Sequence, residues 1–278
     1  MERSIKIAVV QYEIPSDWSA TMDRVDGLLR QARDMGADLA ILPELFNQPY
    51  EMPLVPRMAE PIPEGRTCRR LSAWSRELGL HLVGGSIAEK APDGRIFNTA
   101  TLWDADGRLL AAHRKMHLFD VDLPGGVKVT ESAVFGAGNR VTFADVLGLR
   151  IGLAVCYDVR FPELFRLMAL AGVEFAAVPG AFNNVSGPAH WEMTLRNRAA
   201  ENTFYVAGVS GLAPADAAYH SWGHSMVVDP FAEVLVNLER REGVGLAELR
   251  PERLAEVRRR LPVLSQRRAD VYDLRLKD

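Results

Sequence analysis

The chain has 278 residues, of which 48% are hydrophobic and 25% charged, with a formal net charge of −3. This composition is typical of a globular protein with a large core, and it excludes collagen-like, disordered and strongly basic nucleic-acid-binding chains. No run reaches the ~18 apolar residues of a membrane span, so we expect neither nucleic acid nor a membrane as partner.

The N-terminal part alternates strand and helix patterns. Residues 4–12 alternate apolar and polar side chains and predict a strand, and residues 20–35 show helical apolar spacing. Residues 38–42 predict a short apolar strand, which Pro43 ends because proline cannot donate to a central ladder. Glu44 therefore follows a strand end, where α/β sheets tend to carry function.

The next part is predicted to contain a helix, three strands and a long loop. The helix covers 66–78 and the first strand covers 81–87. The strands at 98–103 and 108–115 are joined by the turn sequence DADG, which is typical of a hairpin. Residues 119–140 have little apolar periodicity and many glycines, which predicts a long loop that is either functional or mobile.

The C-terminal half continues the alternation. A strand at 150–155 leads directly into Cys156, and Pro162 opens a helix over 162–170. Further elements are predicted in chain order: a strand at 174–178, a helix at 190–201, strands at 205–209, 225–228, 233–238 and 245–248, and a basic helix at 251–260. About a dozen strands fit two sheets packed face to face with helices outside.

The chain contains two cysteines, Cys68 and Cys156. They are too few for a disulfide framework and lack the spacing of a zinc site, so we expect free thiols and a reducing, cytoplasmic location. The histidine pairs at 113 and 117 and at 220 and 224 have no acidic or cysteine ligand at matching spacing. The glycines of FGAGNR do not open a helix after a strand. We therefore expect no metal and no cofactor.

Cys156 lies between the strand IGLAV and the proline that opens the next helix. A thiol at such an elbow is held rigidly beside a free backbone N–H, which suits a nucleophile. A buried structural cysteine is the alternative reading, and this segment alone leaves both open.

Three charged residues become informative only together with Cys156. Taken singly, Glu44, Lys115 and Glu131 read as ordinary solvated residues at strand ends or in a loop. A thiol nucleophile, however, needs a general base, and the attacked carbonyl needs a cation or dipoles for its oxyanion. Glu44, Lys115 and Cys156 each end a strand, so they can converge on one rim of a sheet.

The segments ILPELF, HRKMHLFD and GLAVCYDVRFPEL, in this order, resemble the nitrilase superfamily of carbon–nitrogen hydrolases. This resemblance implies an α/β fold, a four-layer α-β-β-α sandwich, that is dimeric or larger and has no cofactor. It implies Cys156 as the acyl-forming nucleophile, Glu44 as general base, Lys115 as stabiliser of the tetrahedral intermediate, and Glu131 as second glutamate. We expect a hydrolase domain over residues 1–250 and a C-terminal tail over 251–278, packing on the domain or on a partner subunit.

Within that superfamily, PELFNQPY, VPGAFNNVSGPAHW and WGHSMVVDP resemble the ω-amidase branch. The resemblance implies a small-molecule substrate, the terminal amide of a 2-oxo dicarboxylic acid such as 2-oxoglutaramate or 2-oxosuccinamate. The guanidinium of Arg160 is then expected to bind the carboxylate of the substrate. An ion pair of Arg160 with Asp158 or Glu163 is an open alternative. The remaining expected substrate-binding residues are Tyr157, which offers its N–H to the oxyanion, and the pocket aromatics Phe119, Phe182 and Tyr50.

Other functions stay open at this point. A deaminated-glutathione amidase shares GPAHWE and GHSMVVDP, and an N-carbamoyl amino acid amidohydrolase would use the same nucleophile. Residues 212–222 differ from the ω-amidase pattern. A non-catalytic metabolite-binding module on the same fold is a hypothesis from another class, but such a module has no need for all four of the residues Glu44, Lys115, Glu131 and Cys156.

Overall fold

The computed structural model describes residues 4–123 and 127–276. The outermost limits of the predicted domain and tail, at residues 1 and 278, therefore lie outside the described residues.

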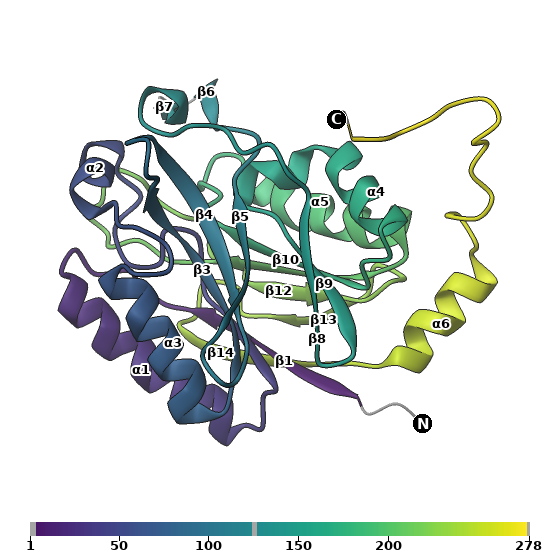
Figure 1. Cartoon of the computed structure of the whole chain (residues 1–278), viewed down its shortest axis with the longest axis horizontal. Coiled ribbons are helices and arrows are strands. Elements are labelled where there is room, and N and C mark those ends of the chain that lie inside the picture. Colours follow the sequence, from purple (N-terminus) through teal and green to yellow (C-terminus); the bar gives the residue numbers. More distant parts are fainter. Residues whose placement is uncertain (1–3, 124–126, 277–278) are drawn as a thin grey trace.

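Two six-stranded sheets form the centre of the molecule (Figure 1). The first has the order β14 (Gly243–Leu249), β1 (Ile5–Gln11), β2 (Leu39–Ile41), β3 (His81–Lys90), β4 (Ile96–Trp103), β5 (Leu109–Arg114). The second has the order β13 (Val234–Asn237), β12 (Met226–Val228), β11 (Tyr205–Ser210), β10 (Phe175–Gly180), β9 (Leu149–Leu153), β8 (Thr142–Val146).

The sheets pack face to face, which explains the apolar character of their central strands. In β1 only Lys6 is exposed, and Ile7 and Val9 point into a core shared with Ile151 and Phe175 of the other sheet. β1, β2 and β3 run parallel, as do β9, β10 and β11. Strands of such parallel sheets are buried on both faces and read as nearly continuous apolar runs.

Helices cover the outer face of each sheet. α1 (Trp18–Asp34) and α3 (Arg66–Leu78) pack on the first sheet through residues such as Leu29 and Trp74. α4 (Pro162–Leu170) and α5 (Gly187–Asn202) pack on the second through Phe165 and Trp191. Figure 1 shows the resulting order of layers, so the predicted four-layer α-β-β-α sandwich is confirmed.

The last helix, α6 (Pro251–Arg260), packs against the part of the molecule that contains the second sheet. Leu254 and Val257 are buried, Arg253 forms an ion pair with Asp229 (2.8 Å), and the guanidinium of Arg258 donates to two backbone carbonyls. Beyond α6 the chain extends along the side of the molecule (Figure 1). The predicted boundary between domain and tail at residue 250 stays a prediction.

Sequence reasoning was wrong about part of the segment 119–140. It contains a two-stranded ribbon, β6 (Asp120–Leu123) paired with β7 (Val127–Thr130), and a short 3₁₀ turn, Glu131–Ala133. The ribbon alternates exposed and half-buried positions and pairs with neither main sheet, so it lacks the apolar face from which strands are recognised. Strand β8 was not predicted, and α5 begins three residues earlier than expected.

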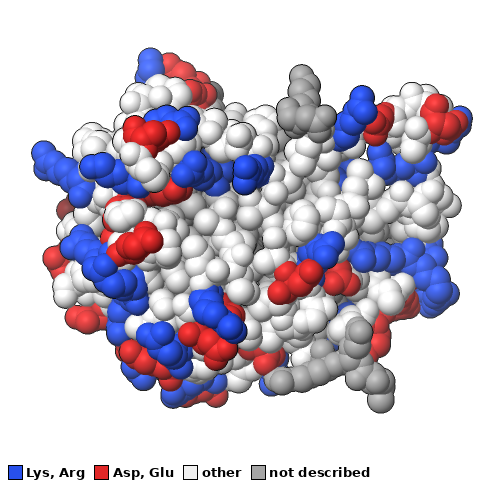
Figure 2. All heavy atoms as spheres, viewed as in Figure 1, with Lys and Arg blue, Asp and Glu red and all other residues white. Residues whose placement is uncertain are grey.

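Short helical turns complete the described chain, at Met52–Leu54, at α2 (Val55–Met58) and at Cys156–Arg160. In the stretches 4–123 and 127–276, no helix combines the length and apolar character needed to cross a membrane. Figure 2 shows acidic and basic side chains interspersed along the rim of one face, around a mainly uncharged centre.

Candidate active site

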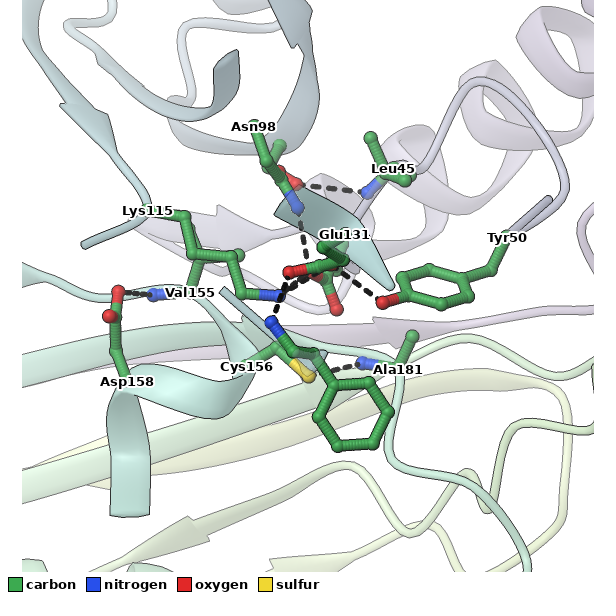
Figure 3. Close-up of polar contacts among 12 residues, drawn as sticks. Leu45, Tyr50, Asn98, Lys115, Glu131, Val155, Cys156, Asp158 and Ala181 are labelled. Carbon is green, nitrogen blue, oxygen red and sulfur yellow. Dashed lines mark hydrogen bonds and ion pairs between the residues drawn. The ribbon is translucent and has the colours of Figure 1, made fainter. Parts of the chain in front are cut away.

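Glu44, Lys115 and Cys156 follow the C-terminal ends of three different strands, β2, β5 and β9. Figure 3 shows Lys115, Glu131 and Cys156 close together, and Glu44 joins them through its contact with Lys115. The ammonium of Lys115 lies 3.0 Å from Oε1 of Glu44 and 2.8 Å from Oε1 of Glu131, and all three side chains are fully buried.

The Glu44 segment is held closely against β3. A Cβ at Gly85 would lie 2.1 Å from the carbonyl oxygen of Pro43, and Gly85 has a φ of +56°, so only glycine fits there without strain. Leu45, whose φ is also positive, donates its N–H to the hydroxyl of Ser86 at 3.0 Å. These contacts fix the backbone on both sides of Glu44.

The pKa values of Lys115 and Glu44 depend on their burial and on the charges around them. Burial lowers the pKa of Lys115, but the carboxylates of Glu131 and Glu44 outweigh burial and raise that pKa well above its usual value. Burial raises the pKa of Glu44, and the positive charge of Lys115 offsets part of this rise. Lys115 is therefore a permanent cation beside a carboxylate that is a better proton acceptor than an exposed one.

Cys156 stands at the predicted elbow, with a φ of +47° at the start of the 3₁₀ turn Cys156–Arg160. Its sulfur accepts the N–H of Ala181 at 3.5 Å. Burial, followed by the charge of Glu44, raises the pKa of the Cys156 thiol well above its ordinary value. The resting residue is therefore a thiol that needs a neighbouring base to become a nucleophile.

Asp158, two residues after Cys156, links the backbone next to Cys156 to the backbone that follows Lys115. Its fully buried carboxylate accepts the N–H of Val155 (2.9 Å) and the N–H groups of Met116 and His117. Ring nitrogens of His113 and His117 lie 3.1 Å and 2.8 Å from its two oxygens. Sequence reasoning missed this anchor, although its position beside Cys156 offered a signal.

Glu131 is held by residues that were predicted as pocket aromatics. The hydroxyl of Tyr50 donates to its Oε1 (2.6 Å), and the backbone N–H of Phe119 donates to its Oε2 (2.7 Å). Tyr50 also lines a narrow cavity of about 20 Å³ together with Glu44, Ala181 and Tyr219. The cavity thus reaches the buried tetrad of Glu44, Lys115, Glu131 and Cys156 at Glu44.

Arg160 is half-buried and makes no ion pair with any described residue, so the predicted alternative pairing with Asp158 or Glu163 is not observed. Its Nη1 lies 3.1 Å from Nδ1 of His190, which was also missed by sequence reasoning. The guanidinium lies over the ring of Phe182 (4.8 Å to the centroid) and near that of Tyr157 (5.7 Å). Aromatic faces and the imidazole of His190 thus hold the guanidinium of Arg160, whose remaining N–H groups have no hydrogen-bond partner among the described residues.

No group of three or more His, Cys, Asp or Glu side chains in the described ranges is arranged to hold a metal ion. His113 and His117, which invited that reading in the sequence, contact Asp158 instead.

Comparison with known proteins agrees with this geometry. The sequence matches the family described as carbon-nitrogen hydrolase over residues 6–259. The chain belongs to this family. It is therefore a hydrolase that acts on carbon–nitrogen bonds, and the predicted nitrilase-type fold is confirmed.

Several relatives of this carbon–nitrogen hydrolase are similar over their whole length. The chain is 40% identical to Omega-amidase NIT2 of Bos taurus over 99% of both chains. The crystal structure of Saccharomyces cerevisiae Nit3, from branch 10 of the nitrilase superfamily, has a TM-score of 0.88 at 34% identity and covers 96% of this chain and 97% of its own. A double mutant of the amidase from Nesterenkonia sp. AN1 in complex with acrylamide has a TM-score of 0.79 at 27% identity, covering 96% and 95%.

Proposed function

We propose that the protein is an ω-amidase, a cysteine-dependent enzyme that releases ammonia from the terminal amide of a small 2-oxo dicarboxylic acid. The observation that carries this proposal is the buried group Glu44–Lys115–Glu131 beside Cys156, with Arg160, a cation that has no acidic partner among the described residues, close by. The similarity to Omega-amidase NIT2 of Bos taurus supports the same substrate class.

In the first half-reaction, Sγ of Cys156 attacks the amide carbon while the thiol proton moves to Glu44. The ammonium of Lys115 and the backbone N–H of Tyr157 stabilise the negative oxygen of the tetrahedral intermediate. Glu44 then returns its proton to the nitrogen, the carbon–nitrogen bond breaks, and ammonia leaves a thioester on Cys156. Lys115 suits this role because two carboxylates keep it charged in a fully buried position.

In the second half-reaction, a water replaces ammonia and attacks the thioester carbon. Glu44 accepts a proton from this water, the carbon–sulfur bond breaks, and Glu44 then returns the proton to Sγ of Cys156. The products are a free carboxylic acid and the regenerated thiol. Glu131 compensates the charge of Lys115 throughout, since its two oxygens are already fixed by Tyr50 and by the N–H of Phe119.

The substrate carboxylate is assigned to Arg160 in this proposal. A guanidinium without an acidic partner in the described chain offers the paired donors that a carboxylate prefers. Burial lowers the pKa of Arg160, and the charges of Cys156 and Tyr219 partly offset this effect, which supports its closeness to the reacting atoms. Phe182 and Tyr157 flank the guanidinium and keep it oriented.

The test is ammonia release from 2-oxoglutaramate, succinamate, glutamine, deaminated glutathione, an N-carbamoyl amino acid and a neutral aliphatic amide. Turnover confined to the ω-amides with a carboxylate is expected. Preference for deaminated glutathione or the carbamoyl compound would change the substrate assignment and leave the assignment of Cys156 as nucleophile in place. No release from any compound would contradict the proposal.

We also propose a cytoplasmic homodimer or larger homo-oligomer. Two free, buried cysteines are compatible with a reducing compartment. Beyond α6, Leu261, Val271, Tyr272 and Leu276 expose apolar side chains, which supports contact of the tail with a second subunit. Light scattering of the full chain at several concentrations tests this, and a monomer at all of them would contradict it.

A further inference from the structure

Asn98 is a fully buried polar residue of strand β4, which also contains the buried residues Thr99 and Thr101. Its Nδ2 donates to Oε1 of Glu44 at 2.8 Å, and its backbone carbonyl accepts the N–H of Lys115 at 2.8 Å (Figure 3). A single residue therefore contacts both the base and the cation of the site. Burying an asparagine costs desolvation free energy unless its hydrogen bonds offset that cost, and asparagine is mostly found exposed. A buried asparagine that contacts two charged residues is therefore unusual in a sheet core.

The contact makes the two oxygens of Glu44 different. Oε1 accepts two donors, Nδ2 of Asn98 and Nζ of Lys115, whereas Oε2 is buried without a hydrogen-bond partner in the described chain. Oε1 is thus occupied in orienting the carboxylate. Oε2 is the oxygen left to exchange a proton with the thiol and with the hydrolytic water.

We infer that Asn98 is a positioning residue that fixes the Glu44 carboxylate with Oε1 bound and Oε2 free for proton transfer. The inference rests on the proposed role of Glu44 as base. An amide is suited to this task because it donates a hydrogen bond without adding charge. A second cation at this position would hold Glu44 ionised too strongly for a base, and an apolar residue would let the carboxylate rotate.

Removing the donor also changes the proton affinity of the base. A hydrogen bond to the charged form of a carboxylate lowers its pKa, so its loss raises the pKa of Glu44. Since the base must be unprotonated to act, the acidic limb of the kcat/KM profile moves to higher pH. Because Glu44 and Cys156 interact, this limb reports the pair rather than one residue.

The experiment compares Asn98→Leu with the matched control Thr99→Val. The hydroxyl of Thr99, the next residue of β4, donates to the buried carboxylate of Glu89 (2.6 Å), so the control also loses a buried hydrogen bond to a carboxylate. Two profiles are measured against pH in a Cys68→Ala background: kcat/KM for 2-oxoglutaramate, and the rate of Cys156 alkylation by iodoacetamide. Iodoacetamide reports thiol activation without amide turnover.

For Asn98→Leu we expect kcat/KM to fall about 10-fold to 100-fold at neutral pH, mainly through kcat, and both acidic limbs to move to higher pH. For Thr99→Val, the acidic limbs of both pH profiles should stay at the same pH as in the parent enzyme. If Asn98→Leu does not fold, Asn98→Ser takes its place, with the same direction of shift. Unchanged limbs and unchanged kcat/KM in the folded variant would overturn the inference while leaving the ω-amidase intact. Absence of ammonia release by the parent, with the alkylation shift present, would instead overturn the proposed function and support Asn98.

Discussion

The hydroxyl of Tyr50 donates a 2.6 Å hydrogen bond to Oε1 of Glu131, the same oxygen that accepts the ammonium of Lys115 at 2.8 Å. Tyr50 therefore lies one contact away from the cation that is proposed to hold the oxyanion. Its ring also packs against Tyr219, with 4.5 Å between centroids, at the edge of the cavity.

Tyr50→Phe should lower kcat about fivefold, because the loss of a hydrogen bond worth about 1 kcal/mol loosens Glu131 and with it Lys115. KM and the melting temperature should change little. Tyr205→Phe is the control, since its hydroxyl contacts the backbone of Arg250 far from the site. Steady-state kinetics of both variants check this, and equal kcat for Tyr50→Phe and the parent would contradict it.

Cys156→Ala should abolish ammonia release and leave the fold intact, because alanine removes only the sulfur, whose contact with the N–H of Ala181 is a long hydrogen bond of 3.5 Å. Cys68 is also buried, and burial raises the pKa of its thiol to about 12, so it is unreactive. Cys68→Ala should therefore retain activity. Ammonia assays combined with circular dichroism make the comparison. Substantial release by folded Cys156→Ala would eliminate it as nucleophile.

Arg160→Ala should raise KM for 2-oxoglutaramate at least tenfold, since hydrogen bonds to a charged group contribute about 1.5–3 kcal/mol. Hydrolysis of a neutral amide should be much less affected. His190→Leu should show the same pattern more weakly, because it removes the acceptor that orients Nη1 of Arg160. An equal loss for charged and neutral amides would rule out carboxylate recognition by Arg160.

Asp158→Asn should destabilise the protein by about 3–5 kcal/mol at pH 7, because it breaks a buried charged network. Burial opposes ionisation, but the histidines and backbone donors hold the pKa of Asp158 well below its usual range. A lowered pKa stabilises the fold above the usual carboxyl value and loses that effect as pH falls toward the lowered one.

The difference in melting temperature between Asp158→Asn and the parent should therefore be largest at neutral pH. It should decrease only below about pH 4. Asp145→Asn is the control, since Asp145 pairs with Arg150 on the exposed surface and should matter little. A pH-independent difference would show that the charge of Asp158 does not provide the stabilisation.

The layers of the fold and the convergence of Glu44, Lys115 and Cys156 were predictable because apolar periodicity and strand ends are local properties of the sequence. The roles of these residues remain predictions. The long-range contacts were not predictable: Asn98 reads as one of three polar residues in FNTATLW, and nothing local indicates that it reaches Glu44, 54 residues away.

The aromatic residues show a second limit. Tyr50 and Phe119 were predicted to shape a pocket, yet their polar contacts with Glu131 come from a hydroxyl and a backbone N–H. Hydrophobic patterns report burial and carry no information about such donors. Strand β8 escaped prediction for a related reason, because its side chains alternate between exposed and half-buried positions until Val146.

The ribbon of β6 and β7 lies between Lys115 and Glu131 in the sequence and belongs to neither main sheet. Its residues Val127, Lys128 and Val129 line a cavity of about 370 Å³ with Asn183 and Tyr219, and Tyr219 also lines the narrow cavity that reaches Glu44. Lys115 and Glu131 also have contacts outside the ribbon, whereas Asp120 of β6 accepts the N–H of Ser132 beside Glu131. We therefore expect substitutions at the cavity-lining positions of β7 to alter the size of amide that is accepted more than the rate of the chemical step.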